Sequence, residues 1–212
     1  MPVKVKICGI ARIEDAIAAA DAGADMIGLN FWPGTPRCVP IGRACEIADA
    51  VRGRVDVIAL FVDAPRDEVI ETAARLGTQT VQLHGSETAA FARGLEGLRV
   101  IKAFHIGSED DLAQLARFPA YAHLLDARLE GMRGGTGRPI DWELARKAAK
   151  HGRVLLAGGL TPGNVAEAVR TVRPWGVDTA SGVETAPGEK DAEKVRLFVE
   201  RANAESGEGE SS

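Results

Sequence analysis

The chain has 212 residues, of which 45% are hydrophobic, 26% are charged and 24 are glycine. This composition is typical of a globular protein with a sizeable core, and it excludes collagen, a coiled coil and a disordered polymer as descriptions of the whole chain. The formal net charge is −4 and no run of basic residues occurs, so we expect no nucleic-acid partner.

The apolar stretches and the cysteine pattern predict a cytoplasmic protein. No stretch approaches the roughly 18 consecutive apolar residues of a membrane span, and residues 1–6 lack the residue order of a signal peptide. The three cysteines, Cys8, Cys38 and Cys45, form no CxxC pair. We therefore expect no membrane contact, free thiols in a reducing compartment, and neither a disulfide framework nor a zinc site.

Eight segments rich in β-forming residues alternate with eight segments whose apolar residues recur at helical spacing. Written as strand and following helix in chain order, they are 3–8 and 13–22, 25–31 and 42–51, 55–62 and 67–76, 80–84 and 87–95, 100–104 and 109–115, 123–126 and 142–150, 154–157 and 165–172, and 176–179 and 192–202. Ser86 and Asp141 are of the residue types that cap helix N-termini, and Gly77 follows a helical segment where a left-handed residue is favoured.

Strict alternation of strand and helix predicts a parallel sheet, and eight units fit a closed (β/α)8 TIM barrel. The alternative is an open doubly wound sheet, which more often carries a GxGxxG fingerprint after its first strand, and the sequence has none there. We expect residues 1–204 to form one compact α/β barrel domain, with about 26 residues per unit. Residues 205–212 are only Glu, Ser and Gly, which predicts a short disordered C-terminal tail.

Cys8 closes the first predicted strand, at the barrel end where TIM barrels carry their chemistry. Because side chains alternate along a strand, Lys6 shares the inward face of Cys8. A buried ammonium needs a partner, and the inward candidates are Asp178 and Asp126. We expect Lys6 to be paired and to favour the Cys8 thiolate. From position alone, Cys8 is equally well interpreted as a small buried hydrophobe.

Asp126 ends the sixth predicted strand, where a carboxylate after an apolar run must be solvated, paired or catalytic. The following loop, 127–139, contains four glycines. A stretch of this kind indicates a mobile lid, although a flexible surface loop without function explains it as well.

Glycine-rich loops after the seventh and eighth strands predict a phosphate site. Gly158 and Gly159 follow the seventh strand, and Ser181 and Gly182 follow the eighth. TIM barrels often bind phosphate at this place, with backbone N–H groups and a helix N-terminus. The alternative is that these glycines only serve turns with positive φ. A phosphorylated, sugar-like ligand follows as a hypothesis.

Two further side chains reach the same end of the barrel. Arg37 lies in the loop after the second strand, where a guanidinium can bind a carboxylate or phosphate with two hydrogen bonds, although an isolated loop arginine is more often solvated. His84 follows the fourth strand, and a structural hydrogen-bonding role suits it at least as well as a catalytic one.

Taken together, these segments resemble the phosphoribosylanthranilate isomerase family, whose members are TIM barrels of tryptophan biosynthesis. The resemblance covers nearly the whole chain except the tail. It is carried by the motifs Lys6-Ile7-Cys8-Gly9, Pro36-Arg37, Gln82-Leu83-His84-Gly85, Leu125-Asp126, Gly134-Gly135-Thr136-Gly137, Asp141-Trp142, Gly158-Gly159-Leu160, Asn164-Val165, Asp178 and Ser181-Gly182-Val183-Glu184. The chain departs from the family pattern at Thr35, Cys38 and Thr179-Ala180.

The resemblance implies an Amadori rearrangement, in which an aminoaldose phosphate becomes an aminoketose phosphate. Asp126 would be the protonated acid and Cys8 the thiolate base, so the pKa of Asp126 should be raised and that of Cys8 lowered. Arg37 would bind the anthranilate carboxylate. By their positions in the family motifs, Gly158, Gly159, Ser181 and Gly182 would lie near the phosphate. Asp178 would help to order the sugar.

The resemblance implies no cofactor and no metal, and it leaves open a monomer or a homodimer and a second activity on a histidine-pathway aminoaldose. Two other functions fit the sequence less well. A metal-assisted pentose-phosphate epimerase would need ligands such as His84 with Asp63 or Asp126, an incomplete set. A non-catalytic barrel that senses a sugar phosphate would have no use for both Cys8 and Asp126.

Overall fold

The computed structural model describes residues 2–127 and 141–205, and within them eight parallel strands form a closed barrel in chain order. The strands are β1 (Lys4–Cys8), β2 (Met26–Asn30), β3 (Asp56–Phe61), β4 (Thr80–Leu83), β5 (Arg99–Ile106), β6 (Ala122–Ala127), β7 (Val154–Leu156) and β8 (Gly176–Thr179). β8 closes the ring by pairing with β1, with Lys6 opposite Asp178. The predicted (β/α)8 barrel is confirmed.

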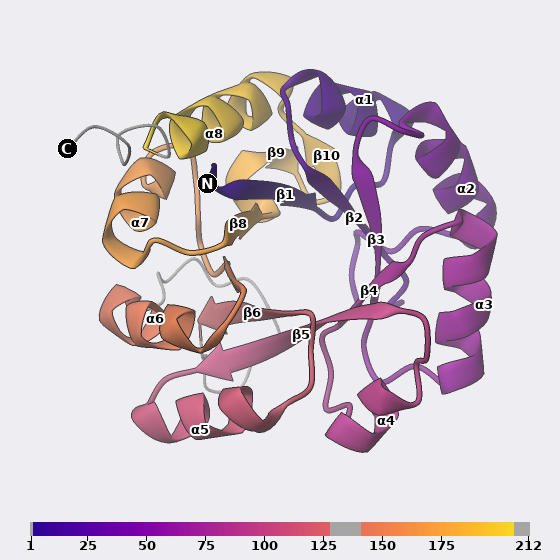
Figure 1. Ribbon diagram of the computed structural model, residues 1–212. Coiled ribbons are helices and arrows are strands. Elements are labelled where there is room, and N and C mark those ends of the chain that lie inside the picture. The colour runs from indigo at the N-terminus through magenta and orange to yellow at the C-terminus, as the bar shows by residue number, and fades with distance from the viewer. Residues whose placement is uncertain (1, 128–140, 206–212) are drawn as a thin grey trace.

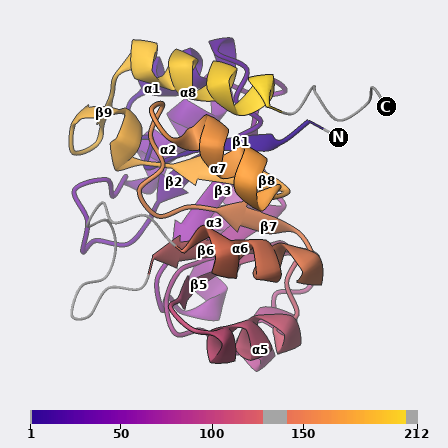
Figure 2. The same ribbon diagram turned by 90° about the vertical axis from the view of Figure 1, so that its left-hand side faces the viewer.

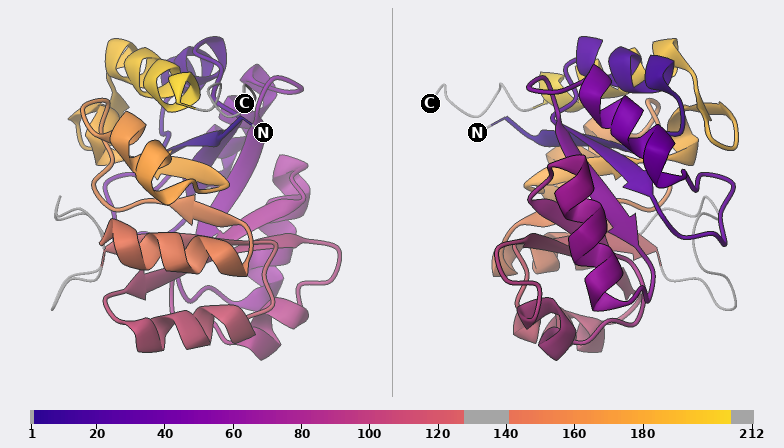
Figure 3. Two further views of the ribbon diagram at one scale, coloured as in Figure 1. Left: turned by 60° about the vertical axis from the view of Figure 1, so that its left-hand side comes forward. Right: turned by 90° about the vertical axis from the view of Figure 1, so that its right-hand side faces the viewer.

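Helices surround the barrel (Figure 1). They are α1 (Ile13–Asp21), α2 (Ile41–Ala50), α3 (Arg66–Leu76), α4 (Ala89–Arg93), α5 (Glu109–Arg117), α6 (Trp142–Ala148), α7 (Val165–Val172) and α8 (Ala192–Ala204). Most consecutive helices pack side by side around the outside, and α8 returns to α1. The two views of Figure 3 show helices on the outside of the barrel. Outward strand residues such as Val5 and Ile7 are fully buried against this layer, as side-chain alternation predicts.

The interior of the barrel has an apolar lower part and a polar upper part. Inward side chains of neighbouring strands, including Met26, Ile58, Ile101 and Leu155, form a separate buried cluster that packs against Trp175 at the start of β8. The inward residues nearer the carboxyl ends of the strands are polar instead. The apolar cluster fills the barrel beneath the polar groups, which lie at the carboxyl end of the strands, where TIM barrels carry their active sites.

One local prediction was wrong and one element was missed, and both cases concern short elements. The fourth helix begins at Ala89, not near residue 87, because the side chain of Thr88, and not Ser86, accepts the capping hydrogen bond from Phe91 N–H. The sequence also gave no sign of the hairpin β9 (Glu184–Ala186) and β10 (Glu189–Lys190), whose strands are too short for a visible alternation. Figure 2 shows this hairpin at the opposite end of the barrel from the start of β1.

Other predictions meet the described residues only in part. Asp141 caps α6 as expected, accepting hydrogen bonds from Glu143 and Leu144 N–H. Glu205, placed at the start of the predicted tail, is the C-cap of α8 and pairs with Arg170 at 3.0 Å. The rest of the tail and the predicted lid, beyond residue 127, lie outside the described residues. No helix in the described part of the chain is long and apolar enough to cross a membrane.

Candidate active site

A cavity of about 250 Å³ lies at the carboxyl end of the barrel. Its wall contains every residue to which the sequence assigned chemistry or substrate binding: Cys8, Arg37, Asp126, Gly158, Gly159, Asp178, Ser181 and Gly182. Trp32, Gln82, His84 and His105 also line it. Strands far apart in the sequence therefore bring the predicted residues to one place.

Lys6 is the most deeply buried charge of this site. Its Nζ donates a hydrogen bond to Asp178 Oδ1 at 2.7 Å, and its side chain is fully buried. A Cβ at Gly28 on β2 would lie 2.9 Å from Cys8 Sγ and 3.2 Å from Lys6 Nζ, so the thiol and the ammonium share the space beside this glycine. Burial opposes the charge, yet Asp178 and Cys8 raise the pKa of Lys6 above its usual value. The prediction that Lys6 is paired is confirmed, and of the two candidates Asp178 is the partner.

Cys8 departs from the expected electrostatics. Burial raises the pKa of its thiol, and the nearby carboxylate of Asp178 acts in the same direction. The cations Lys6 and Lys190 lower this pKa, as expected for Lys6, but they do not overcome the burial. The expectation that the Cys8 pKa lies below its ordinary value was therefore wrong.

Asp126 lies across the cavity beside a pair of histidines. Its Oδ2 is 3.8 Å from His84 Nε2, and the rings of His84 and His105 are 5.9 Å apart. The other ring nitrogen of His84, Nδ1, lies 2.9 Å from Gln82 Nε2. Burial, followed by the charges of His105, Lys6 and Lys102, lowers the pKa of His84 to about 3. His84 is therefore neutral at physiological pH.

The two glycine-rich loops are locked to one another. Gly158 and Gly159 have φ values of 79° and 80°, which favour glycine. Leu160 O accepts a hydrogen bond from Thr179 Oγ1 at 2.8 Å, and a Cβ at Gly182 would lie 2.0 Å from the same oxygen. Only glycine allows this approach, so the loop after β7 and the short helix η2 (Ser181–Val183) form one wall of the cavity.

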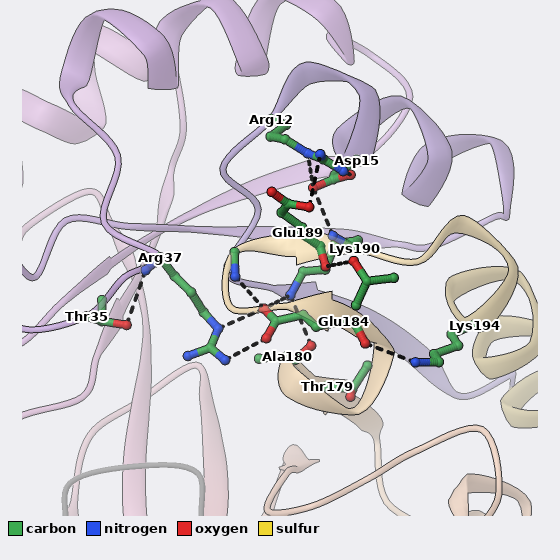
Figure 4. A network of polar contacts seen from close by, with 12 residues as sticks. Arg12, Asp15, Thr35, Arg37, Thr179, Ala180, Glu184, Glu189, Lys190 and Lys194 are labelled. Carbon is green, nitrogen blue, oxygen red and sulfur yellow. Dashed lines mark hydrogen bonds and ion pairs between the residues drawn. The ribbon is translucent and has the colours of Figure 1, made fainter.

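Arg37 is held by partners that sequence reasoning missed. Its Nε and Nη2 donate to both carboxylate oxygens of Glu184, at 2.8 and 2.6 Å. Lys190 Nζ donates to Glu184 Oε1 at 2.9 Å and to Ala180 O at 3.0 Å, and Figure 4 shows Arg37 and Lys190 both reaching Glu184. The two cations hold the pKa of Glu184 below its usual value although burial opposes this. Glu184 ends the Ser-Gly-Val-Glu motif, which is the only signal in the sequence that marks it.

Comparison with known proteins gives the same assignment from independent observations. The family model described as N-(5'phosphoribosyl)anthranilate (PRA) isomerase matches residues 5–201. The N-(5'-phosphoribosyl)anthranilate isomerase of Geobacter metallireducens is 47% identical over 202 residues, which cover 95% of this chain and 100% of that protein. The chain belongs to the N-(5'-phosphoribosyl)anthranilate isomerase family.

Solved structures of phosphoribosylanthranilate isomerases also have this fold. The crystal structure from Thermotoga maritima matches with a TM-score of 0.89 and 34% identity, over 95% of this chain and 99% of that one. A structure described as the isomerase in complex with reduced 1-(o-carboxyphenylamino)-1-deoxyribulose 5-phosphate matches with a TM-score of 0.86 and 32% identity, with the same coverage. The predicted family, the isomerase class and the place in tryptophan biosynthesis are confirmed by these relationships.

The metal-assisted alternative finds no ligand set in the described residues. Within 2–127 and 141–205, no three His, Cys, Asp or Glu side chains are grouped so that they could hold a metal ion. Asp63, one of the candidate ligands, instead accepts a hydrogen bond from Ser86 N–H at 2.6 Å.

Proposed function

We propose that the cavity converts N-(5'-phosphoribosyl)anthranilate into 1-(2-carboxyphenylamino)-1-deoxyribulose 5-phosphate, with Asp126 as general acid and Cys8 as general base. The observation that carries this assignment is that a thiol from β1 and a carboxyl from β6 line one cavity together with two glycine-rich loops. An aldose-to-ketose isomerisation needs one proton donor and one proton acceptor on the same sugar.

The first step opens the ring. Protonated Asp126 donates its proton to the furanose oxygen while the bond between that oxygen and C1 breaks, and the nitrogen lone pair forms an iminium at C1. The Cys8 thiolate then removes the proton from C2, and the C2–H electron pair moves to make the enolamine. Return of a proton to C1 and loss of the proton on the C2 hydroxyl give the ketone, so all atoms remain in the molecule.

Lys6 and Lys190 supply the electrostatic support for the base. Burial raises the pKa of Cys8 and so favours the thiol over the thiolate. Both cations lower this pKa and so favour the thiolate. Lys190 is held by Glu184 and Ala180, and Lys6 by Asp178. We therefore assign Asp178 to the support of Lys6 as well as to the ordering of the sugar.

The remaining residues would position a small substrate that is anionic at both ends. Arg37 lies on the cavity wall with its guanidinium fixed by Glu184, and a fixed planar guanidinium suits the anthranilate carboxylate. Gly158, Gly159, Ser181 and Gly182 line the same cavity from the loops after β7 and β8. Backbone N–H groups in such loops suit a phosphate. The isomerase structure that holds a reduced aminoketose phosphate supports this choice of ligand.

We further propose a cytoplasmic location, in line with the three free cysteines and the biosynthetic family. The decisive experiment is steady-state turnover of N-(5'-phosphoribosyl)anthranilate by the purified chain, with the aminoketose product identified by mass and chromatography. Asp126→Asn and Cys8→Ser should each lower kcat by at least about 100-fold, because each removes one proton-transfer group. Full turnover by either variant would remove that residue from the mechanism.

A further inference from the structure

Three side chains form a row that leads to the proposed acid. Gln82 and His84 point inward from the carboxyl end of β4, two residues apart, and Asp126 points inward from β6. Gln82 is fully buried, and its Nε2 lies 2.9 Å from His84 Nδ1. The opposite ring nitrogen, Nε2, faces Asp126 Oδ2 across 3.8 Å. The imidazole thus lies between an amide and the carboxyl group.

The charge state of His84 follows from its surroundings. Burial, followed by the charges of His105 and Lys102 on β5 and of Lys6 on β1, holds its pKa at about 3. A neutral imidazole has one N–H and one nitrogen that accepts a hydrogen bond. In this orientation of the Gln82 amide its nitrogen faces Nδ1, and Gln82 Oε1 is buried without a hydrogen-bond partner among the described residues. With the amide so oriented, Nδ1 is the acceptor and the proton of His84 lies on Nε2.

We propose that Gln82 and His84 are positioning residues for the acid. Gln82 fixes the tautomer of His84, and the Nε2–H of His84 holds Asp126 Oδ2, so that Oδ1 carries the proton delivered to the sugar. This inference rests on the proposed role of Asp126 as general acid. The distance of 3.8 Å is longer than a hydrogen bond, and we expect it to shorten when the substrate fills the cavity.

A neutral donor suits an acid better than a charged one does. An imidazolium beside Asp126 would stabilise the carboxylate strongly and remove the proton before the sugar arrives. A neutral N–H can hold Oδ2 of the protonated acid, and it stabilises the carboxylate formed after proton transfer less than an imidazolium would. Burial, together with the nearby charges, keeps His84 in this neutral form, and His84 then does not remove the proton of Asp126.

The first test reads the tautomer directly and does not depend on turnover. Nitrogen-15 NMR of histidine-labelled wild-type protein at about pH 7 should show a neutral His84 with its proton on Nε2. Gln82→Met removes the amide donor but keeps the length of the side chain, and the Nδ1–H tautomer should then become populated. A wild-type signal from Nδ1–H, or from a doubly protonated ring, would overturn the proposal.

The second test compares two substitutions of His84. Gln can place an uncharged N–H near the position of Nε2, whereas Leu cannot. His84→Leu should lower kcat by about 10- to 100-fold with little change in KM. It should also move the limb of the kcat profile that reports Asp126 to higher pH, because the Asp126 carboxylate loses a donor. His84→Gln should recover most of the rate and return the limb toward its wild-type position.

Equal kcat values and pH profiles for His84→Leu and His84→Gln, in variants whose thermal unfolding matches that of the wild type, would contradict the proposal. Asp126→Asn separates this failure from a failure of the proposed function. If Asp126→Asn turns over normally, the acid is misassigned. If Asp126→Asn is inactive and the two His84 variants behave alike, only the positioning role is wrong.

Discussion

Two lysines of β1, Lys4 at its start and Lys6 in its middle, form the same kind of ion pair in opposite surroundings. Lys4 pairs with Asp25 at 2.6 Å near the lower end of the barrel, where the two side chains are 45% and 29% exposed. Lys6 pairs with Asp178 at 2.7 Å, with exposures of 0% and 10%. The chemistry and distance are nearly identical, so the difference between the pairs is water.

Water decides what each pair can do. The Lys4 pair is solvated, and exposed pairs of this kind contribute little to stability and exert screened fields. The Lys6 pair has lost its water, so its charges act at full strength on whatever is nearby. The nearest reactive group is the thiol of Cys8, whose pKa responds to both Lys6 and Asp178. The buried Lys6 pair is thus placed to act on the Cys8 thiol, whereas the Lys4 pair is solvated.

The largest effect should come from breaking the buried pair. Lys6→Met leaves the Asp178 carboxylate buried without its cation, and removal of one partner of such a pair typically costs about 3–5 kcal/mol. Urea unfolding of the purified variant should show this loss, together with loss of turnover. A change below about 1 kcal/mol would mean that the pair is effectively solvated.

A double variant protects this test against a variant that does not fold. Lys6→Met with Asp178→Asn removes both charges and keeps the shape of the acceptor, so the orphaned charge is no longer present. Most of the lost stability should return while activity stays low. If the double variant were no more stable than the single one, burial of the lone carboxylate would not be the cause.

The pair of Arg37 with Glu184 should give the next largest effect. Glu184→Gln weakens the two hydrogen bonds that fix the guanidinium, so KM should rise by about 10- to 100-fold while kcat falls less. Glu193→Gln is the matched control, because Glu193 pairs with Arg196 on the exposed face of α8. A similar KM in both variants and the wild type would show that Arg37 needs no such support.

Acid should destabilise the upper end of the barrel through His84. Its pKa is about 3 in the folded protein against an ordinary value of 6.5, so the unfolded chain binds a proton first as the pH falls. The contribution of neutral His84 to the free energy of unfolding is therefore fully present above pH 6.5. It declines as the pH falls toward 3, by up to about 1.4 kcal/mol per pH unit. Urea unfolding at about pH 7 and about pH 5 measures it, and His84→Gln should flatten the dependence.

The smallest effect is expected at the exposed pair. Lys4→Met should change the free energy of unfolding by no more than about 1 kcal/mol and leave kcat unchanged, since the pair with Asp25 is solvated. The same urea and turnover measurements used for Lys6→Met give a direct comparison. If Lys4→Met lost as much free energy of unfolding as Lys6→Met, burial would not be what separates the two ion pairs.

Much of the site could be predicted because a TIM barrel places strand ends together. Once eight strands were identified, alternation alone placed Lys6 and Cys8 inside and Val5 and Ile7 outside. The same alternation limited the partner of Lys6 to Asp178 or Asp126, and the structure selects Asp178 on the adjacent eighth strand.

Two features could not be predicted, for different physical reasons. The contact between Arg37 and Glu184 joins residues 147 positions apart and depends on the turn of a hairpin with very short strands. The sign of the Cys8 pKa shift depends on the balance between burial and Asp178, which raise the pKa, and two lysines, which lower it. A sequence shows that such opposing effects exist, but their balance depends on depth and distance.

The most direct test of the account is the titration of Cys8 by its rate of alkylation as a function of pH, in a Cys38→Ser/Cys45→Ser background so that one thiol reports. The Lys6→Met/Asp178→Asn variant, which removes both buried charges, serves as a reference. The account predicts that Lys6→Met raises the apparent pKa of Cys8 above that of the wild type, while Lys4→Met leaves it unchanged. An unchanged Cys8 pKa in Lys6→Met would contradict the claim that the buried ammonium supports the base.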